Sequence, residues 1–312
     1  MFSSVCLIIA FLSLAQSCPS SENLYPCTCK MEHNTADIIC SRLDNEQDLV
    51  NAASALKMRN YIERFKIENS NFNFIPHNAF INVKFQDLEL ENSNMFSLTD
   101  TDVAFEGMED TLQALVISNS SLLNTWDWSV LRKLRALRKI EISGGDLESV
   151  NKDIEEINNG MLIIVLSNNK ISRIYDTAFS KFKNLLILEL NNNFLTEVKR
   201  EIIPNPAVLL RKIDLSYNEI KNFPEDMFEN IPNLEWLNIS WNKILTLNER
   251  TFSPVWQKLK NFEALGNELR CDCRMAWILN LTYPKTLKAE CAEPKAVRGH
   301  NIETLTAKTL WC

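Results

Sequence analysis

Histidine, cysteine and paired carboxylates are the side chains in this sequence that could carry out chemistry if the fold gathered them. The three histidines, His33, His77 and His300, are spread over the chain, and nothing in their spacing brings them together. The sequence contains no G-x-S-x-G, no H-E-x-x-H and no phosphate-binding or dinucleotide-binding glycine loop. Only six glycines are available to build tight cofactor loops. We therefore predict no catalytic residue, no cofactor and no enzymatic activity.

The cysteines gather at the two ends of the chain. Cys6 lies in an apolar leader, and none of the other eight falls between residues 41 and 270. They form two groups of four: Cys18, Cys27, Cys29 and Cys40, then Cys271, Cys273, Cys291 and Cys312. Adjacent C-x-C residues are too close to bond easily, which leaves two disulfide connectivities open in each group. Zinc is the weaker interpretation, because such clusters in secreted chains are usually disulfides, and we predict no metal site.

The first 17 residues carry no charge and are mostly apolar. Ala15 and Ser17 fit the small-residue positions of a signal-peptidase site, so we predict a signal peptide over residues 1–17 and a secreted mature chain. No other segment approaches the 18 consecutive apolar residues of a membrane span. The net charge of −7 disfavours nucleic acid or an anionic membrane as the partner.

A repeated pattern, L-x-x-L-x-L-x-x-N-x-L, supplies the elements that must position any functional residue. We align the repeats on the second apolar residue of the L-x-L pair. This residue recurs every 23 to 27 residues, at Ile67, Leu90, Ile117, Ile142, Leu166, Leu190, Leu215, Ile239 and Ala264. Such a period is typical of a solenoid, in which each repeat contributes one short strand to a curved parallel sheet. We predict nine repeats over residues 61–269, a cysteine cap at 18–60 and a second cap at 270–312, with short irregular or 3-10 convex segments.

A polar column follows the strands three positions after the aligned residue. It is Asn in the last five repeats, from Asn169 to Asn267, but Ser or Gly in the first four. A buried Asn can satisfy backbone groups in its own turn and in the neighbouring one. Because Ser offers fewer such bonds and Gly none, we expect a less regular and looser N-terminal half.

The outward strand positions are rich in carboxylates. Five of the nine residues between the two inward apolar positions are acidic, among them Glu189 and Asp214. One interpretation is simply a solvated face on an acidic protein. The other is an acidic stripe on the concave face that attracts a basic partner.

Aromatic residues form a second candidate surface. Tyr217 and Trp241 occupy one column in adjacent repeats, where strands ~4.8 Å apart should bring their rings close. Trp236 lies on the same strand as Trp241, and exposed Trp and Tyr are typical binding hot spots. The alternative is that these aromatics only cover the turn.

Glycosylation sequons occur at Asn119, Asn238 and Asn280. Asn238 is an outward strand residue, so a glycan there would stand on the concave sheet and crowd the aromatic surface.

The repeats, together with the flanking segments CPSSENLYPCTC and CDCRMAWIL, resemble extracellular leucine-rich repeat proteins with cysteine caps at both ends. The second cap departs from the usual pattern, because GNELRCDC lacks a proline. The resemblance implies the α/β horseshoe class and a crossed disulfide pattern: Cys18 with Cys29, Cys27 with Cys40, Cys271 with Cys291, and Cys273 with Cys312.

A narrower resemblance comes from ENLYPCTC, the ICS around Cys40, and the IENSN and LENSN segments. These are similar to arthropod secreted proteins named after the non-catalytic subunit of the luciferin monooxygenase of a deep-sea shrimp. In that family the oxidation belongs to a separate small subunit.

We thus expect a protein-binding module that uses the concave face of repeats six to nine, with Tyr217, Trp236, Trp241, Glu189 and Asp214 as candidate contacts. The alternatives are an accessory subunit of a secreted oxidase, whose partner is a small catalytic chain, and an extracellular matrix component.

Overall fold

The computed structural model describes residues 18–32, 35–57, 62–122 and 126–310 of the 312-residue chain. The expected signal peptide, His33 and Cys312 lie outside these ranges. The chain divides into two compact units. Unit 1 runs to Asp146 and includes Glu156–Asn158, and unit 2 comprises Leu147–Glu155 and the chain from Asn159 onward.

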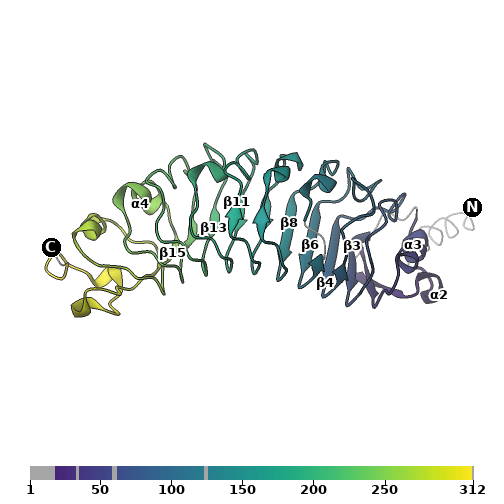
Figure 1. The fold of residues 1–312 in the computed structure, drawn as a ribbon, viewed down its shortest axis with the longest axis horizontal. Helices are drawn as coiled ribbons and strands as arrows, with labels where there is room; N and C mark the ends of the chain where they lie inside the picture. The colour runs from purple at the N-terminus through teal and green to yellow at the C-terminus, as the bar shows by residue number, and fades with distance from the viewer. Residues whose placement is uncertain (1–17, 33–34, 58–61, 123–125, 311–312) are drawn as a thin grey trace, which may run out of the picture. The chain divides into compact units, whose positions relative to one another are not determined.

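Unit 1 is built on six hydrogen-bonded strands (Figure 1). Strand β1 (Cys27–Glu32) runs antiparallel to β2 (Thr35–Ser41), and the remaining strands are parallel: β3 (Ile62–Glu68), β4 (Asp87–Glu91), β6 (Ala114–Ser118) and β8 (Lys139–Ser143). The smaller elements are α2 (Ser21–Leu24), α3 (Glu46–Ser54), η1 (Trp128–Leu131), β5 (Asn94–Met95) and β7 (Ser121–Leu122). Cys40 pairs with Ile67 across β2 and β3, so the cap continues the column predicted for the repeats.

Unit 2 continues the same plan with shorter strands (Figure 1). Its parallel strands are β10 (Ile163–Val165), β12 (Ile187–Glu189), β13 (Lys212–Asp214), β14 (Trp236–Asn238), β15 (Asn261–Glu263) and β16 (Thr286–Lys288). Two-residue strands β9 (Ser149–Val150) and β11 (Arg173–Ile174) pair with each other. Short helices follow the strands: η2 (Lys152–Glu156), η3 (Arg200–Ile202), α4 (Glu249–Trp256), η4 (Cys273–Asn280), η5 (Lys295–Val297) and η6 (Ile302–Thr304). The predicted leucine-rich repeat solenoid is confirmed, with one strand for each of the nine aligned positions.

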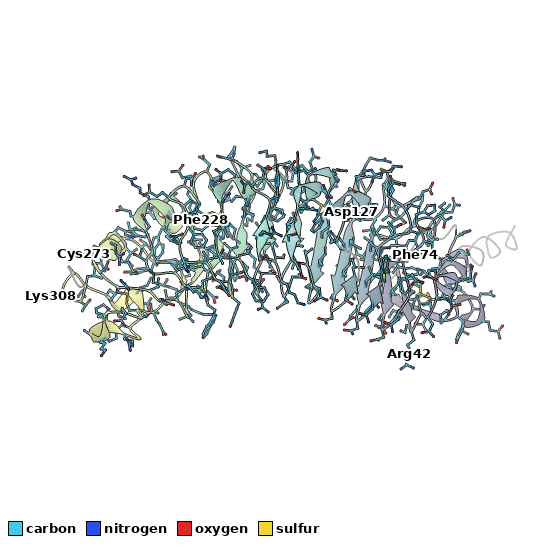
Figure 2. The ribbon with its side chains drawn as sticks, in the orientation of Figure 1. Arg42, Phe74, Asp127, Phe228, Cys273 and Lys308 are labelled. Carbon is cyan, nitrogen blue, oxygen red and sulfur yellow. A yellow bond between two sulfur atoms is a disulfide. The ribbon has the colours of Figure 1, made fainter. Side chains whose placement is uncertain are left out.

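The core lies between the strands and the return segments. Inward strand residues such as Leu188, Leu237 and Phe262 are buried, while their neighbours in the sequence are only partly covered, which is the period of two expected for a strand. Phenylalanines from the return segments stack behind them. In unit 2, Phe228, labelled in Figure 2, lies 5.4 Å from Phe252 between ring centroids. The apolar positions of every repeat thus form one continuous interior within each unit.

An asparagine ladder runs through unit 2. The Nδ2 group of Asn218 donates to the carbonyls of Leu190, Leu215 and Ser216 at 3.0, 3.1 and 3.2 Å, and its Oδ1 accepts from the amide of Leu195 at 3.0 Å. Asn193, Asn242 and Asn267 repeat this arrangement. Each buried amide therefore joins its own turn to the preceding repeat.

The expectation of a less regular N-terminal half is wrong. Unit 1 contains a serine ladder, in which the amide of Ser70 donates to Ser93 Oγ at 3.1 Å and the amide of Ser93 donates to Ser120 Oγ at 3.0 Å. Each hydroxyl in turn donates to a carbonyl two residues earlier, as Ser93 does to Glu91. Strands β4, β6 and β8 have five residues each, against three in most strands of unit 2. A hydroxyl suffices because it accepts from the amide of the column residue in the preceding repeat, as Ser93 Oγ accepts from Ser70.

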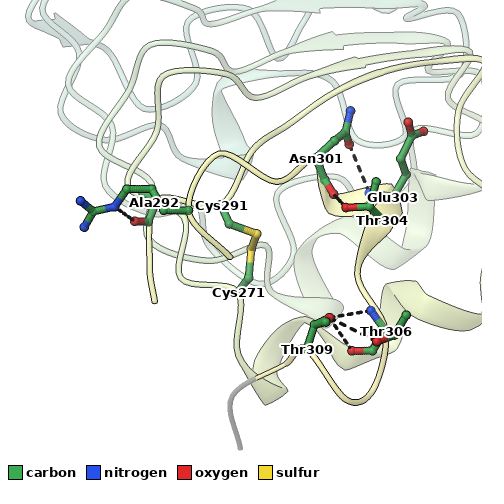
Figure 3. Close-up of a disulfide and its surroundings, with 9 residues drawn as sticks. Cys271, Cys291, Ala292, Asn301, Glu303, Thr304, Thr306 and Thr309 are labelled. Carbon is green, nitrogen blue, oxygen red and sulfur yellow. Dashed lines mark hydrogen bonds between the residues drawn. A yellow bond between two sulfur atoms is a disulfide. The ribbon is translucent and has the colours of Figure 1, made fainter. Parts of the chain in front are cut away.

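The caps contain the disulfides Cys18–Cys29, Cys27–Cys40 and Cys271–Cys291, in the connectivity that the resemblance implies. Figure 3 shows Cys271–Cys291 beside Ala292 in the second cap. Cys273 is also disulfide-bonded, and its expected partner, Cys312, lies outside the described residues. Disulfides in small caps are typical of chains that fold in an oxidising compartment.

Candidate protein-binding site

A column of left-handed backbone positions borders the strands of both units. It comprises Arg42, Asn69, Asn92, Asn119, Gly144, Asn168, Asn192, Tyr217, Trp241 and Gly266, with φ between +47° and +68°. Asn and Gly tolerate this region, whereas bulky side chains cost about 1 kcal/mol or more there. Tyr217 and Trp241 are thus strained at two adjacent positions that other repeats give mainly to Asn or Gly.

The two strained residues form an ordered aromatic pair. Their ring centroids are 5.7 Å apart with an interplanar angle of 15°, and each side chain is 52% exposed. The amide of Tyr217 donates to the Ser240 carbonyl at 2.9 Å. A Cβ atom added to Gly266 would lie 2.5 Å from Trp241 Cε3, so the indole rests directly on the Gly266 backbone. The pair is positioned on both sides and still presents half its surface to solvent.

Trp236 does not join this pair. It begins β14, and the Nζ of Lys212 lies 4.5 Å from its ring centroid. The same ammonium is 2.7 Å from Glu189 Oε1. Within the described ranges, no ring contact links Trp236 to Tyr217 or Trp241. The candidate contacts therefore fall into two groups on unit 2, the aromatic pair and a Glu189–Lys212–Trp236 group.

The outward carboxylates are largely neutralised by cations on neighbouring strands. In unit 1, Arg64 lies 3.1 Å from Glu89 and 3.7 Å from Asp37. In unit 2, Lys288 lies 3.2 Å from Glu263, in addition to the Lys212–Glu189 pair. These contacts favour the interpretation of a solvated, internally paired face over that of an uncompensated acidic stripe.

Asp214 is the exception on unit 2. It is only 9% exposed, and its Oδ1 accepts from the Ser216 amide at 3.0 Å and from the Ser216 hydroxyl at 2.6 Å. Burial raises the pKa of this carboxyl above its ordinary value, although the bonds from Ser216 and the nearby Lys212 act in the opposite direction. In the next repeat, Asn238 Oδ1 accepts from the Ser240 amide at 3.0 Å in the same way without a charge.

Asp214→Asn should therefore stabilise the protein at neutral pH. When a carboxyl has a higher pKa in the folded chain than in the unfolded chain, ionisation is easier in the unfolded chain. The protein therefore loses stability as the pH rises from the unfolded pKa to the folded pKa. The gain should disappear below the ordinary carboxyl pKa of 3.8, where both states are protonated. Urea unfolding at both pH values measures it, and Glu197→Gln, an exposed carboxylate, is the control. An equal effect at both pH values would contradict the assignment.

The sequons occupy different surroundings. Asn119 is exposed in the left-handed column, and Asn238 lies on β14 in register with Asp214 and Glu263. Asn280 ends η4, and its side chain is not described. A glycan on Asn238 would stand between the two groups of candidate contacts.

The two described histidines, His77 and His300, belong to different units. His77 Nδ1 in unit 1 lies 3.2 Å from Asp100 Oδ1, and His300 is exposed in the cap of unit 2. Over the described ranges, no cluster of His, Cys, Asp or Glu has an arrangement that could hold a metal ion. In the same ranges, no helix is long enough and apolar enough to cross a membrane.

The chain is similar to a repeat family and to several known proteins. A family model described as leucine rich repeat matches residues 208–256. The chain is 22% identical over 94% of its length to the Oplophorus-luciferin 2-monooxygenase non-catalytic subunit of Oplophorus gracilirostris, covering 87% of that protein. It is 24% identical to toll-like receptor 9 of Mus musculus and 26% to lumican of Rattus norvegicus, over 74% and 59% of its length. It spans 23% and 52% of those two proteins.

A solved structure gives the same result for the fold. A chain in the octameric complex of latrophilin 3, Unc5D and FLRT2, in which FLRT2 is the leucine-rich repeat component, superposes with a TM-score of 0.64 at 18% identity. The match covers 94% of this chain and 95% of the other.

Proposed function

We propose that this leucine-rich repeat protein, which has disulfide-bonded cysteines near both termini, is a secreted protein-binding module. It has no catalytic activity of its own, and residues 1–17 direct its secretion. The partner contacts unit 2 through Tyr217 and Trp241, with the Glu189–Lys212–Trp236 group and Asp214 on the adjoining strand face.

The observation that carries this proposal is the left-handed backbone at Tyr217 and Trp241. A strained aromatic that is half exposed gains little from burial, so local stability does not account for its presence. Stacked, preorganised Tyr and Trp side chains lose little entropy on binding, which makes them strong anchors for a protein partner.

Partner capture from the native fluid tests the site. Tyr217→Ala/Trp241→Ala should lose the captured protein, and Gly266→Ala should weaken capture by displacing the indole without removing an aromatic. Gly144→Ala is the matched control, because Gly144 has a φ of +67° against +68° for Gly266, but an added Cβ there meets Asn119 instead. Phe194→Ala removes an equally exposed aromatic, 52%, from outside the column. Unchanged recovery with the double variant would refute the site.

A second candidate function is that of an accessory subunit in a secreted oxidase. It is favoured by the similarity to the non-catalytic monooxygenase subunit, which extends over 94% of this chain. Co-purification of a small catalytic chain from the native secretion would support it. Recovery of this chain without any oxidase would count against it.

A further inference from the structure

A groove lies beside the aromatic pair, where the last repeat meets the second cap. It encloses about 570 Å³. One wall comes from Leu245 and the segment from Gly266 to Arg270, and the other from Glu290–Glu293 and Arg298–Gly299. All of these residues belong to unit 2. Leu245 is 38% exposed, so the groove offers an apolar wall as well as charged ones.

The groove is preformed. The amides of Ala292 and Glu293 donate to the Leu269 carbonyl at 2.8 and 3.1 Å, and the amide of Gly299 donates to the Cys291 carbonyl at 2.8 Å. The Cys271–Cys291 disulfide links the two walls next to Ala292 (Figure 3). A wall held in this way needs little ordering when a ligand binds.

Gly266 makes the groove continuous with the aromatic pair. The indole of Trp241 rests on the backbone of Gly266, and Gly266 itself lines the groove. A chain that packs against Tyr217 and Trp241 therefore reaches Leu245 and the cap wall without crossing another repeat. A groove that continues from the aromatic pair between two walls suits an extended polypeptide.

The charges along this path favour a basic occupant. Arg298 is already engaged, because its Nη2 lies 2.5 Å from Glu293 Oε1 and its Nε donates to the Ala292 carbonyl at 3.0 Å. Glu268 and Glu290 are exposed, and within the described part of the chain neither side chain has a cation partner. Arg270 is the one groove cation in the described ranges that no carboxylate pairs. Two carboxylates against one guanidinium leave the groove net negative.

We propose that this groove binds an extended segment of the partner protein that carries an apolar side chain followed by Lys or Arg. The apolar side chain packs on Trp241 and Leu245, and the basic side chain reaches Glu268 and Glu290. This inference rests on the proposed function, because it names the chemistry of the segment that the aromatic pair anchors.

A library of random linear peptides displayed on phage and panned against the full oxidised chain tests it. Selected peptides should be enriched in Lys and Arg relative to the input library. Glu268→Gln/Glu290→Gln should weaken their binding roughly fivefold to tenfold and flatten its dependence on salt. Arg270→Gln should strengthen binding, because it removes the opposing charge from the same groove.

The outcomes separate this inference from the proposed function. Peptides that are lost with Tyr217→Ala/Trp241→Ala but are indifferent to Glu268→Gln/Glu290→Gln would overturn the groove and leave the aromatic site intact. Peptides that are indifferent to the aromatic variant would overturn the proposed site. Selection without any basic bias, or weaker binding with Arg270→Gln, would also overturn the inference.

Discussion

Tyr217→Asn/Trp241→Asn should abolish partner binding while lowering the free energy of unfolding by no more than about 2 kcal/mol. Asparagine is the residue that most other repeats place at this left-handed position, so the substitution relieves strain of about 1 kcal/mol at each site. It also removes one stacked pair, worth about 0.5–1.5 kcal/mol beyond its area, from side chains that are only half covered. The relief of strain offsets the loss of stacking, and the covered half of each ring leaves a remaining cost of about 1–2 kcal/mol. A hot-spot residue contributes about 2 kcal/mol, or roughly thirtyfold in affinity, so loss of both aromatic anchors should reduce affinity by roughly a hundredfold to a thousandfold.

Urea unfolding and partner capture on the same preparations check this expectation. Asn192→Ala, at the preceding position of the column, should lower stability and leave capture unchanged, because it introduces a less tolerant residue but removes no aromatic. If the double asparagine variant instead lost more than about 2 kcal/mol of stability and kept its partner, the aromatics would be turn covers.

The repeat architecture could be predicted because three sequence columns stay in phase over nine copies. Period-two burial at Leu188 and Leu190, or at Leu237 and Ile239, requires only that the strands be parallel and stacked. The cap strands were harder to predict. Cys40 and Ala289 continue the inward column in β2 and beside β16, yet neither belongs to a recognisable copy of the motif.

The serine ladder shows where counting hydrogen-bond donors fails. Ser70 and Ser93 have fewer donors than asparagine, which made a looser half the natural expectation. Their hydroxyls accept from an amide two residue positions closer to the strand than the amide that asparagine binds, so a shorter side chain reaches its partner. Which amide is offered depends on the backbone path between strands, and residue type alone does not specify that path.

The strained aromatic pair left a signal in the sequence. The residue two positions after each aligned apolar residue is mostly Asn or Gly, as at Asn92, Gly144 and Asn168, and those are the residues that favour a positive φ. Tyr217 and Trp241 stand out only when this column is examined beside the asparagine ladder. The neutralisation of Glu189 and Glu263 was also accessible from register, because Lys212 and Lys288 lie on the adjoining strands. The separation of Trp236 from the pair depends on side-chain direction, which strand register does not specify.

Asn218→Ala should cost the protein about 4 kcal/mol, while Ser93→Ala should cost about 2 kcal/mol. Asn218 makes four hydrogen bonds to buried backbone groups. In the alanine variant the Leu195 amide loses this acceptor, while each of the three carbonyls loses one of two donors. Ser93 makes two such bonds, one as acceptor and one as donor. A hydrogen bond contributes about 1 kcal/mol net to stability, so the ratio should follow the number of bonds.

Hydrogen exchange on the two variants distinguishes this account from a general loss of packing. Asn218→Ala should accelerate exchange at the amide of Leu195, which donates to Asn218 Oδ1, and in the adjoining turns of unit 2. Ser93→Ala should accelerate exchange at the amide of Ser70 in unit 1. Because repeats in a solenoid contact mainly their neighbours, each effect should fade within about two repeats of the substitution. Equal costs for the two variants, or exchange that rises uniformly over both units, would mean that the ladders act through core volume and not through their hydrogen bonds.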